Sequence, residues 1–281
     1  MRALEPEVFD AVFEQTESLL PAPPDHHPLG CHRPRVPDRI CLWAMLVRLV
    51  TGCSWVDAER LVGGTVSDTT LRTRRDEWIA AGVFDALAEI MVGAYEAAIG
   101  LDLDDAMVDG SIHKAPCGGE GTGKSPVDRG KLGWKWSLAT DAVGIPIGWV
   151  AAGANRNDSV LLPATLEAVD DQGLLEEIST LHLDRGYDNG VVRAHVAELG
   201  IAEVVVPKVR PKEGTTRRAP TRVPLGRRWP VERTNSWLSN YGQLRRNTDR
   251  KLVHRGAQLA FVIAILLIVR LLDGGHLQKR P

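Results

Sequence analysis

The sequence has few cysteines, and their spacing excludes two common kinds of site. Four cysteines occur in 281 residues, at separations of 10, 12 and 64 residues. These separations fit neither a zinc-ligand pair nor a disulfide framework. The N-terminal residues also lack the basic segment followed by an apolar one that marks a protein for export. Together these absences favour a chain that works in a reducing cytoplasm.

Long apolar runs are scarce as well. The longest extends from Leu259 to Val269 and is followed by Arg270. It is shorter than the roughly 18 to 20 residues that a membrane span requires. We therefore expect a buried C-terminal helix and no membrane contact. The hydrophobic content of 44% is sufficient for a substantial core.

Net charge is small, at −2, but it is unevenly distributed. Between Lys208 and Arg255 there are fourteen lysines and arginines against three acids, which are Glu213, Glu232 and Asp249. Such a density of positive charge favours a polyanionic partner. A solvated charged face would have the same composition, so charge alone does not decide between the two.

Residues 1–100 have the pattern of a helical domain. Apolar residues at helical spacing predict helices over 40–50, 54–62 and 67–80, with Ser54 as an N-cap. Their short connections resemble a helix-turn-helix. The third helix presents polar and basic residues suited to DNA, in particular Arg72, Arg74 and Arg75. An ordinary helical bundle with a charged outer face accounts for the same pattern.

From residue 101 the pattern changes to short strands that alternate with helices. Strands are predicted over 106–112, 134–140, 145–151, 180–184 and 202–207, with helices over 159–169 and 190–199. This predicts an α/β (α+β) domain over 101–281, with a mixed five-stranded sheet and flanking helices. A basic, proline-rich loop at 208–226 precedes a helix that begins near Trp229.

Three acids in this segment lie where a metal site is expected. Asp109 is inside an apolar strand, where a carboxylate is costly unless it is paired or binds a metal. Asp184 follows a buried strand, and Glu232 lies in the first turn of a helix. If the three converge, their oxygens suit Mg²⁺, and a pair of such ions promotes phosphodiester chemistry. A capping role for Asp184 and a helix-dipole role for Glu232 are the ordinary alternatives.

Five motifs carry a resemblance that runs in order from about residue 40 to 272. They are Met-Val-Asp109-Gly-Ser, Gly133-Trp-Lys-Trp-Ser-Leu-Ala-Thr-Asp141, Gly153-Ala-Asn-Arg-Asn-Asp158, Leu183-Asp184-Arg-Gly-Tyr-Asp188 and Arg228-Trp-Pro-Val-Glu232-Arg-Thr-Asn-Ser-Trp-Leu. In these motifs the chain resembles bacterial insertion-sequence transposases, which have a DDE catalytic triad on an RNase H-like fold.

The resemblance implies that Asp109, Asp184 and Glu232 hold two Mg²⁺ ions, with Mn²⁺ as a possible substitute. It implies binding to terminal inverted repeats, DNA cleavage, and transfer of 3′-hydroxyl ends to target DNA by a homodimer at the bacterial nucleoid. Arg228 is then expected to contact the element's end. Further DNA contacts are expected at Arg233, Arg245, Arg246 and Lys135, and supporting roles behind the ligands at Arg185, Tyr187, Asp188, Asn155 and Asp158.

Two positions depart from the family pattern. Leu225 stands where a tyrosine is expected, and Ser239 where a lysine is expected. Arg245 and Arg246 are candidates to supply the missing phosphate contact.

Two other interpretations stay open. Residues 118–125 match the phosphate-loop pattern GxxxxGK[ST], which would make the chain a nucleotide hydrolase. That loop needs a helix directly after it, and none is predicted there. Alternatively, the chain is a DNA-binding regulator that retains an inactive transposase fold.

Overall fold

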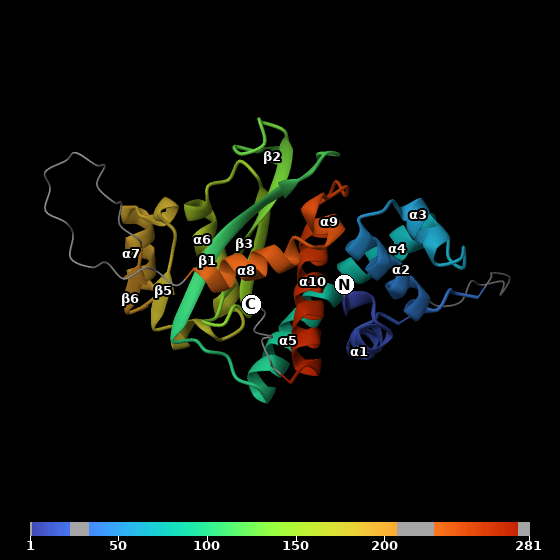
Figure 1. The fold of residues 1–281 in the computed structure, drawn as a ribbon, viewed down its shortest axis with the longest axis horizontal. Coiled ribbons are helices and arrows are strands. Elements are labelled where there is room, and N and C mark those ends of the chain that lie inside the picture. The colour runs from blue at the N-terminus through green and yellow to red at the C-terminus, as the bar shows by residue number, and fades with distance from the viewer. Residues whose placement is uncertain (1, 23–33, 207–227, 275–281) are drawn as a thin grey trace, which may run out of the picture. The chain divides into compact units, whose positions relative to one another are not determined.

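The structure is a computed structural model that describes residues 2–22, 34–206 and 228–274. The chain divides into two compact units (Figure 1). The first unit combines residues 1–100 with 113–121 and 238–281, and the second combines 101–112 with 122–237. The basic loop predicted at 208–226, with Leu225, lies outside the described residues.

The first unit is helical, as the sequence predicts. The helix-turn-helix-like segment is formed by α2, α3 and α4, whose bounds lie close to those expected. Ser54 caps α3 by accepting a hydrogen bond from the backbone N–H of Asp57, and Ser67 caps α4 through Thr70. The helices of this unit are η1 (Arg2–Leu4), α1 (Pro6–Glu17), α2 (Asp38–Thr51), α3 (Trp55–Leu61), α4 (Asp68–Ala80), α5 (Val83–Ala98), α9 (Gly242–Arg245) and α10 (Leu252–Leu272).

The C-terminal helix α10 is the apolar centre of this unit. It packs against α5, α1 and α4, and its apolar residues from Leu259 to Ile265 are all buried. By length and hydropathy it could cross a membrane, yet 67% of its most apolar window is buried within the protein. It is longer than the predicted apolar run because its polar first turns are helical too. There the buried Arg255 donates to the carbonyls of Gly118 and Asp249.

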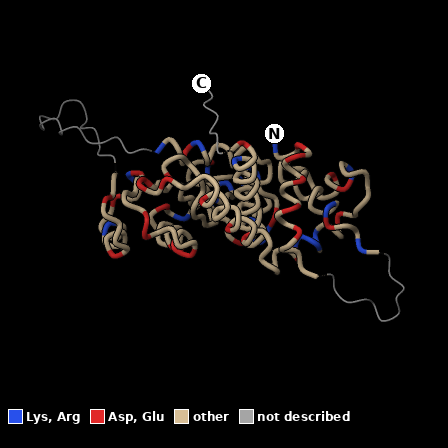
Figure 2. The backbone as a smooth tube through the Cα atoms, turned by 90° about the horizontal axis from the view of Figure 1, so that it is seen from below, with Lys and Arg blue, Asp and Glu red and all other residues tan. Residues whose placement is uncertain are grey.

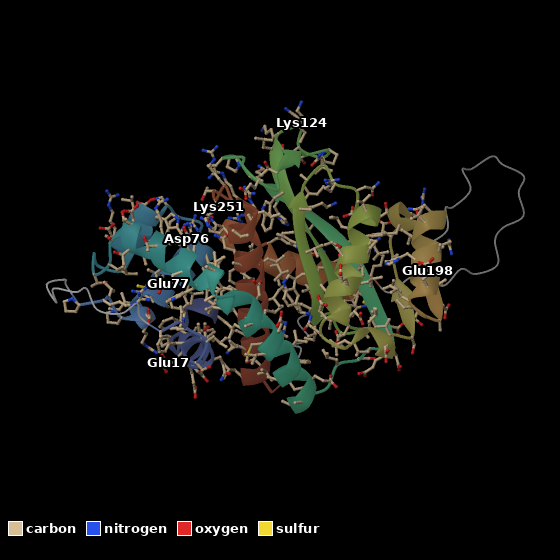
Figure 3. The ribbon with its side chains drawn as sticks, turned by 180° about the vertical axis from the view of Figure 1, so that it is seen from behind. Glu17, Asp76, Glu77, Lys124, Glu198 and Lys251 are labelled. Carbon is tan, nitrogen blue, oxygen red and sulfur yellow. The ribbon has the colours of Figure 1, made fainter. Side chains whose placement is uncertain are left out.

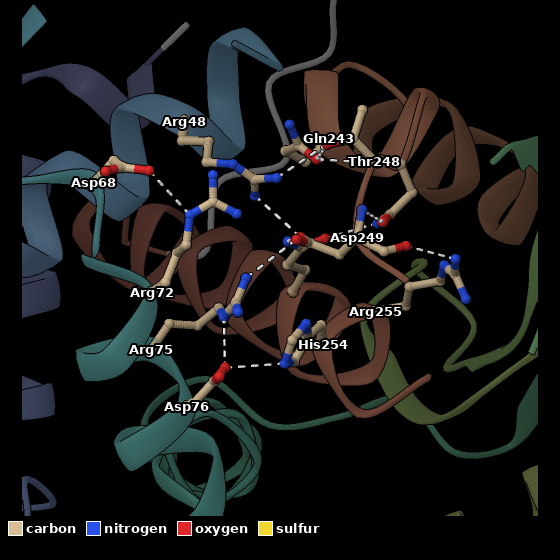
Figure 4. A network of polar contacts seen from close by, with 12 residues as sticks. Arg48, Asp68, Arg72, Arg75, Asp76, Gln243, Thr248, Asp249, His254 and Arg255 are labelled. Atoms are coloured by element: carbon tan, nitrogen blue, oxygen red, sulfur yellow. Dashed lines mark hydrogen bonds and ion pairs between the residues drawn. The ribbon is translucent and has the colours of Figure 1, made fainter. Parts of the chain in front are cut away.

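A buried ion network ties the start of α10 to the N-terminal helices (Figure 4). The Asp249 carboxylate lies 3.1 Å from the guanidinium groups of both Arg48 on α2 and Arg75 on α4. Burial raises the pKa of Asp249, but the two arginines outweigh it and hold that pKa below its ordinary value. Trp55 adds a ring that lies 4.2 Å from the Arg48 guanidinium. The network therefore joins residues that are 174 and 201 positions apart in the sequence.

In the second unit, the described residues form a mixed sheet of six strands. The strands lie in the order β2-β3-β1-β5-β6, and β4 pairs with β3. The β3–β4 pair is antiparallel, whereas β1–β5 and β5–β6 are parallel. Their bounds are β1 (Asp105–Lys114), β2 (Gly123–Lys124), β3 (Leu132–Thr140), β4 (Pro146–Gly153), β5 (Thr180–His182) and β6 (Glu203–Val205).

The predicted mixed sheet with flanking helices is confirmed, but within the described ranges it has six strands and not five. The additional strand, β2, has only two residues and lies in a glycine-rich segment without an apolar pattern. The helix α6 packs on β3 and β4. The remaining elements of this unit are α6 (Asp158–Asp170), η2 (Leu175–Glu177), η3 (Arg185–Tyr187), α7 (Gly190–Glu198) and α8 (Trp229–Leu238).

The turn between β3 and β4 is built around Asp141, whose side chain is fully buried. Its carboxylate accepts hydrogen bonds from the backbone N–H groups of Ile145, Val143 and Asp102. Burial raises the pKa of Asp141 to about 6, although these three donors act in the opposite direction. Gly144 closes the turn with a φ of 88°, which favours glycine.

The ion network generates a stability prediction. The substitution Asp249→Ala leaves two buried guanidinium groups without their shared partner, so we expect a loss of about 3 to 5 kcal/mol in the free energy of unfolding. Urea denaturation followed by circular dichroism measures it. The control is Asp10→Ala, which removes the exposed partner of Arg39 and should cost no more than about 1 kcal/mol. Equal, small losses in both variants would contradict the role of the network.

Asp141 generates a prediction about pH. Because its pKa is raised in the folded state, its stabilising contribution is complete below about pH 4 and is lost as the pH rises through about 6. Between pH 4 and 7 the wild type should therefore lose on the order of 1 to 3 kcal/mol relative to Asp141→Asn, which does not titrate. Urea titrations at several pH values compare the two. Parallel pH profiles would refute the raised pKa.

Candidate active site

The helix α8 is fixed to the β3–β4 hairpin by three consecutive residues. Asn235 accepts a 2.7 Å hydrogen bond from the indole of Trp136 on β3. Thr234 donates to the carbonyl of Gly144, and Arg233 donates to the carbonyl of Val143. With this face of α8 turned towards the hairpin, Glu232 is left on the exposed face, where 54% of its side chain is accessible.

Asp109 lies on β1, and its carboxylate contacts the same Arg228 guanidinium as Glu232 of α8 does. Only 20% of its side chain is exposed. Burial raises the pKa of Asp109 to about 6, and the nearby carboxylates of Asp158 and Glu232 act in the same direction. The Arg228 guanidinium and the N–H of Gly110 oppose this rise. An ionised Asp109 therefore depends on a cation beside it.

Arg228 brings the three predicted acids to one point. Its guanidinium nitrogens lie 3.4 Å from an Asp109 oxygen, 3.6 Å from an Asp184 oxygen and 3.3 Å from a Glu232 oxygen. These acids come from β1, from the residue that caps η3 after β5, and from α8. Asp184 does have the capping role foreseen as its alternative, through the N–H of Arg185, and it reaches the Arg228 cluster at the same time.

The donor set suits a hard divalent cation, because it consists of carboxylate oxygens alone. In the part of the chain that the structure describes, no three His, Cys, Asp or Glu side chains are spaced as ligands of one metal ion. The three carboxylates surround a guanidinium, which is larger than a metal ion. The residues therefore fit a cation site by chemistry, and their side chains must close in to bind a metal.

A lysine and a fourth acid lie beside Asp109. Lys135 on β3 is buried, and its ammonium lies 2.5 Å from an Asp158 oxygen. Because its ammonium is buried and paired, Lys135 presents no free cation to a phosphate, in contrast to the DNA contact expected from the sequence. Gly110 permits the arrangement, since a Cβ there would lie 1.9 Å from the Asp158 carboxylate. The motif around Asp158 signalled this proximity, but nothing in the sequence signalled its lysine partner.

The other supporting residues differ in their surroundings. Tyr187 is buried near Asp109 and Asp158, and burial raises the pKa of its hydroxyl. Asp188 forms an exposed ion pair with Arg193. Arg185 and Asn155 are exposed. Tyr187 is therefore the one whose position best fits direct support of the three acids.

The predicted DNA contacts of α4 fall into two groups. Arg72 is exposed and pairs with Asp68. Arg74 and Arg75 are buried, with partners that include Asp38 for Arg74 and Asp249 for Arg75. Because their guanidinium groups are buried and already have partners inside the first unit, they present little surface to a phosphate, in contrast to the DNA contacts expected from the sequence.

The remaining arginines keep an exposed or half-exposed side. Arg245 and Arg246 are exposed at the end of α9 in the first unit. Arg233 lies between two rings, 4.5 Å from the ring centre of Trp229 and 4.6 Å from that of Trp237. Basic and acidic residues are interspersed along the backbone of both units (Figure 2). The described residues thus show no wholly basic segment.

The phosphate-loop match does not form a phosphate loop. Lys124 belongs to β2 and is exposed at its tip (Figure 3), and the chain continues through turns into β3, with no helix after Ser125. A nucleotide site needs the N-terminus of a helix at this point. The glycines serve packing instead, because a Cβ on Gly119 would lie 2.1 Å from the carbonyl oxygen of Arg250.

Two family models match the chain. Residues 8–88 match "Putative transposase of IS4/5 family", and residues 102–268 match "Transposase DDE domain". A protein of Burkholderia cepacia, "Putative transposase for insertion sequence element IS402", is 35% identical over 144 residues, which cover 49% of this chain and 64% of that protein. The chain thus spans less than two thirds of this relative.

Further similarity is found in a second protein and in solved structures. "Insertion element IS402 uncharacterized 16.2 kDa protein", also of Burkholderia cepacia, is 34% identical over 43% of this chain and 82% of its own length. "Crystal structure of a pre-cleavage Mos1 transpososome" is 10% identical, with a TM-score of 0.28, over 95% of this chain and 86% of that one. A superposition of that quality adds no detail to the site. The DDE-domain match contains all three acids that converge on Arg228, and the chain therefore belongs to the transposase DDE domain family.

Proposed function

We propose that the chain is an insertion-sequence transposase that cuts DNA at the ends of its element and joins them to target DNA. The convergence of Asp109, Asp184 and Glu232 on one guanidinium is the observation that supports this proposal. DDE transposase domains use divalent metal ions. We assign two Mg²⁺ ions to these acids, and Mn²⁺ suits the same oxygens.

The bound ions would stabilise charge on the phosphate and activate the attacking oxygen. The protein's own contribution is to hold the carboxylates. Asp109 is held on a central strand, and Glu232 is held by the anchoring of α8 on the β3–β4 turn. One such site can serve both cleavage and end joining, since each is an in-line displacement at phosphorus.

DNA is the proposed partner, as terminal inverted repeats and as target. Arg228, Arg233, Arg245, Arg246 and Arg72 are the proposed contacts, because each has an exposed or half-exposed side chain. Two element ends must be held together during transfer, so we propose a homodimer on DNA, acting in the cytoplasm at the nucleoid. The functional division into a DNA-binding part at 1–100 and a catalytic part at 101–281 is part of the same proposal.

The acids generate a direct test. A duplex that carries the element's terminal repeat should be nicked in Mg²⁺ and not in EDTA. Asp109→Asn and Glu232→Gln should each slow nicking by about a hundredfold or more, because each removes a charged ligand worth several kcal/mol of transition-state stabilisation. Rates are measured on gels with end-labelled DNA. The control is Glu198→Gln, an exposed acid on α7 (Figure 3) that should nick at the wild-type rate.

The same experiment separates the enzyme from an inactive regulator. A regulator would bind the repeat in a gel-shift assay and leave it intact in both Mg²⁺ and Mn²⁺. Wild-type rates in Asp109→Asn or Glu232→Gln would refute the assignment of the acids.

A further inference from the structure

The position of Arg228 raises a question about the state of the site before metal binds. Three carboxylates that face one point repel one another, and burial of Asp109 strengthens this repulsion. The guanidinium of Arg228 contacts all three acids at 3.3 to 3.6 Å. It therefore lies on the point towards which the acids face, which is where a metal ion would be expected.

We propose that Arg228 is the counter-ion of the three acids in the metal-free protein and that it competes with divalent metal for them. The inference rests on the proposed function only in taking Asp109, Asp184 and Glu232 as the metal ligands. Metal binding then requires the guanidinium to leave the carboxylates and the carboxylates to move together.

The geometry indicates that the Arg228 guanidinium and a metal ion cannot contact these carboxylates at the same time. Glu232 and Asp109 contact the same nitrogen of the guanidinium, so a metal ion between these two oxygens would meet the positive group directly. Over the described ranges, no group of three side chains has metal-ligand spacing, which is the expected result if the guanidinium holds the acids apart.

Within the residues that the structure describes, no further side-chain hydrogen bond or ion pair holds the Arg228 guanidinium in place. Its Nε atom is buried and has no hydrogen-bond partner among the residues that the structure describes. About a fifth of its side chain is exposed, so solvent is within reach of the group when it leaves. Over the described ranges, its ion pairs are those with the three acids.

A calorimetric titration of DNA-free protein with Mn²⁺ tests the inference without any assay of activity. Arg228→Gln should bind Mn²⁺ at least tenfold more tightly than the wild type, because the competing cation is gone. Arg228→Lys should fall between the two, since an ammonium keeps the charge but not the planar, multiple donors. Arg193→Gln removes one exposed cation of the same unit and should bind within twofold of the wild type.

Thermal unfolding gives a second readout. In EDTA, Arg228→Gln should have a lower Tm than the wild type. Excess Mn²⁺ should then raise the Tm of Arg228→Gln by more than it raises the Tm of the wild type. Equal or weaker Mn²⁺ binding by Arg228→Gln, with binding abolished by Asp109→Asn, would overturn the inference and leave the metal assignment intact. If the double variant Asp109→Asn, Arg228→Gln still bound Mn²⁺ more tightly than the wild type, the ion would lie elsewhere. That result would overturn the inference. If neither wild type nor variant binds Mn²⁺, both the inference and the proposed metal site fail.

Discussion

Repulsion among carboxylates is the constraint around which the second unit is organised. Asp109, Asp184 and Glu232 come from separate elements, and each would be more stable in isolation than beside the other two. Arg228 offsets the repulsion at the centre, with three contacts of 3.3 to 3.6 Å. Behind Asp109, Lys135 does the same for Asp158. Two cations thus permit four acids to lie together near the middle of β1.

Where Glu232 lies depends on a turn that carries no catalytic group. Asp141 organises the β3–β4 turn through three backbone N–H groups. The carbonyls of that turn, at Val143 and Gly144, then receive Arg233 and Thr234 of α8. A buried carboxylate with a raised pKa therefore helps to set the position of Glu232 on α8. The Asn235–Trp136 hydrogen bond reinforces the same placement from β3.

Sequence patterns predicted what depends on local periodicity. The helices of the first unit, the main strands of the second and the strand position of Asp109 all follow from the spacing of apolar residues and from caps such as Ser54 and Ser67. Sequence patterns could not show which charged side chains are paired inside the protein. Arg75 looks like a surface residue of a recognition helix, yet its partner Asp249 is 174 positions away. Lys135 looks like a phosphate contact, yet it is buried against Asp158.

An arginine suits position 228 better than a lysine because of the shape of its charged group. A lysine ammonium is a compact charge, whereas a guanidinium is planar, always protonated and has several N–H donors in fixed directions. The guanidinium can contact three carboxylates from different elements at once, and it keeps them further apart than a small ion would. A group of this size keeps the acids together but too widely spaced for a metal ion. In the proposed exchange, Arg228 would hold the three acids near one another in the metal-free protein, and the acids would move closer together when a metal ion is bound in its place.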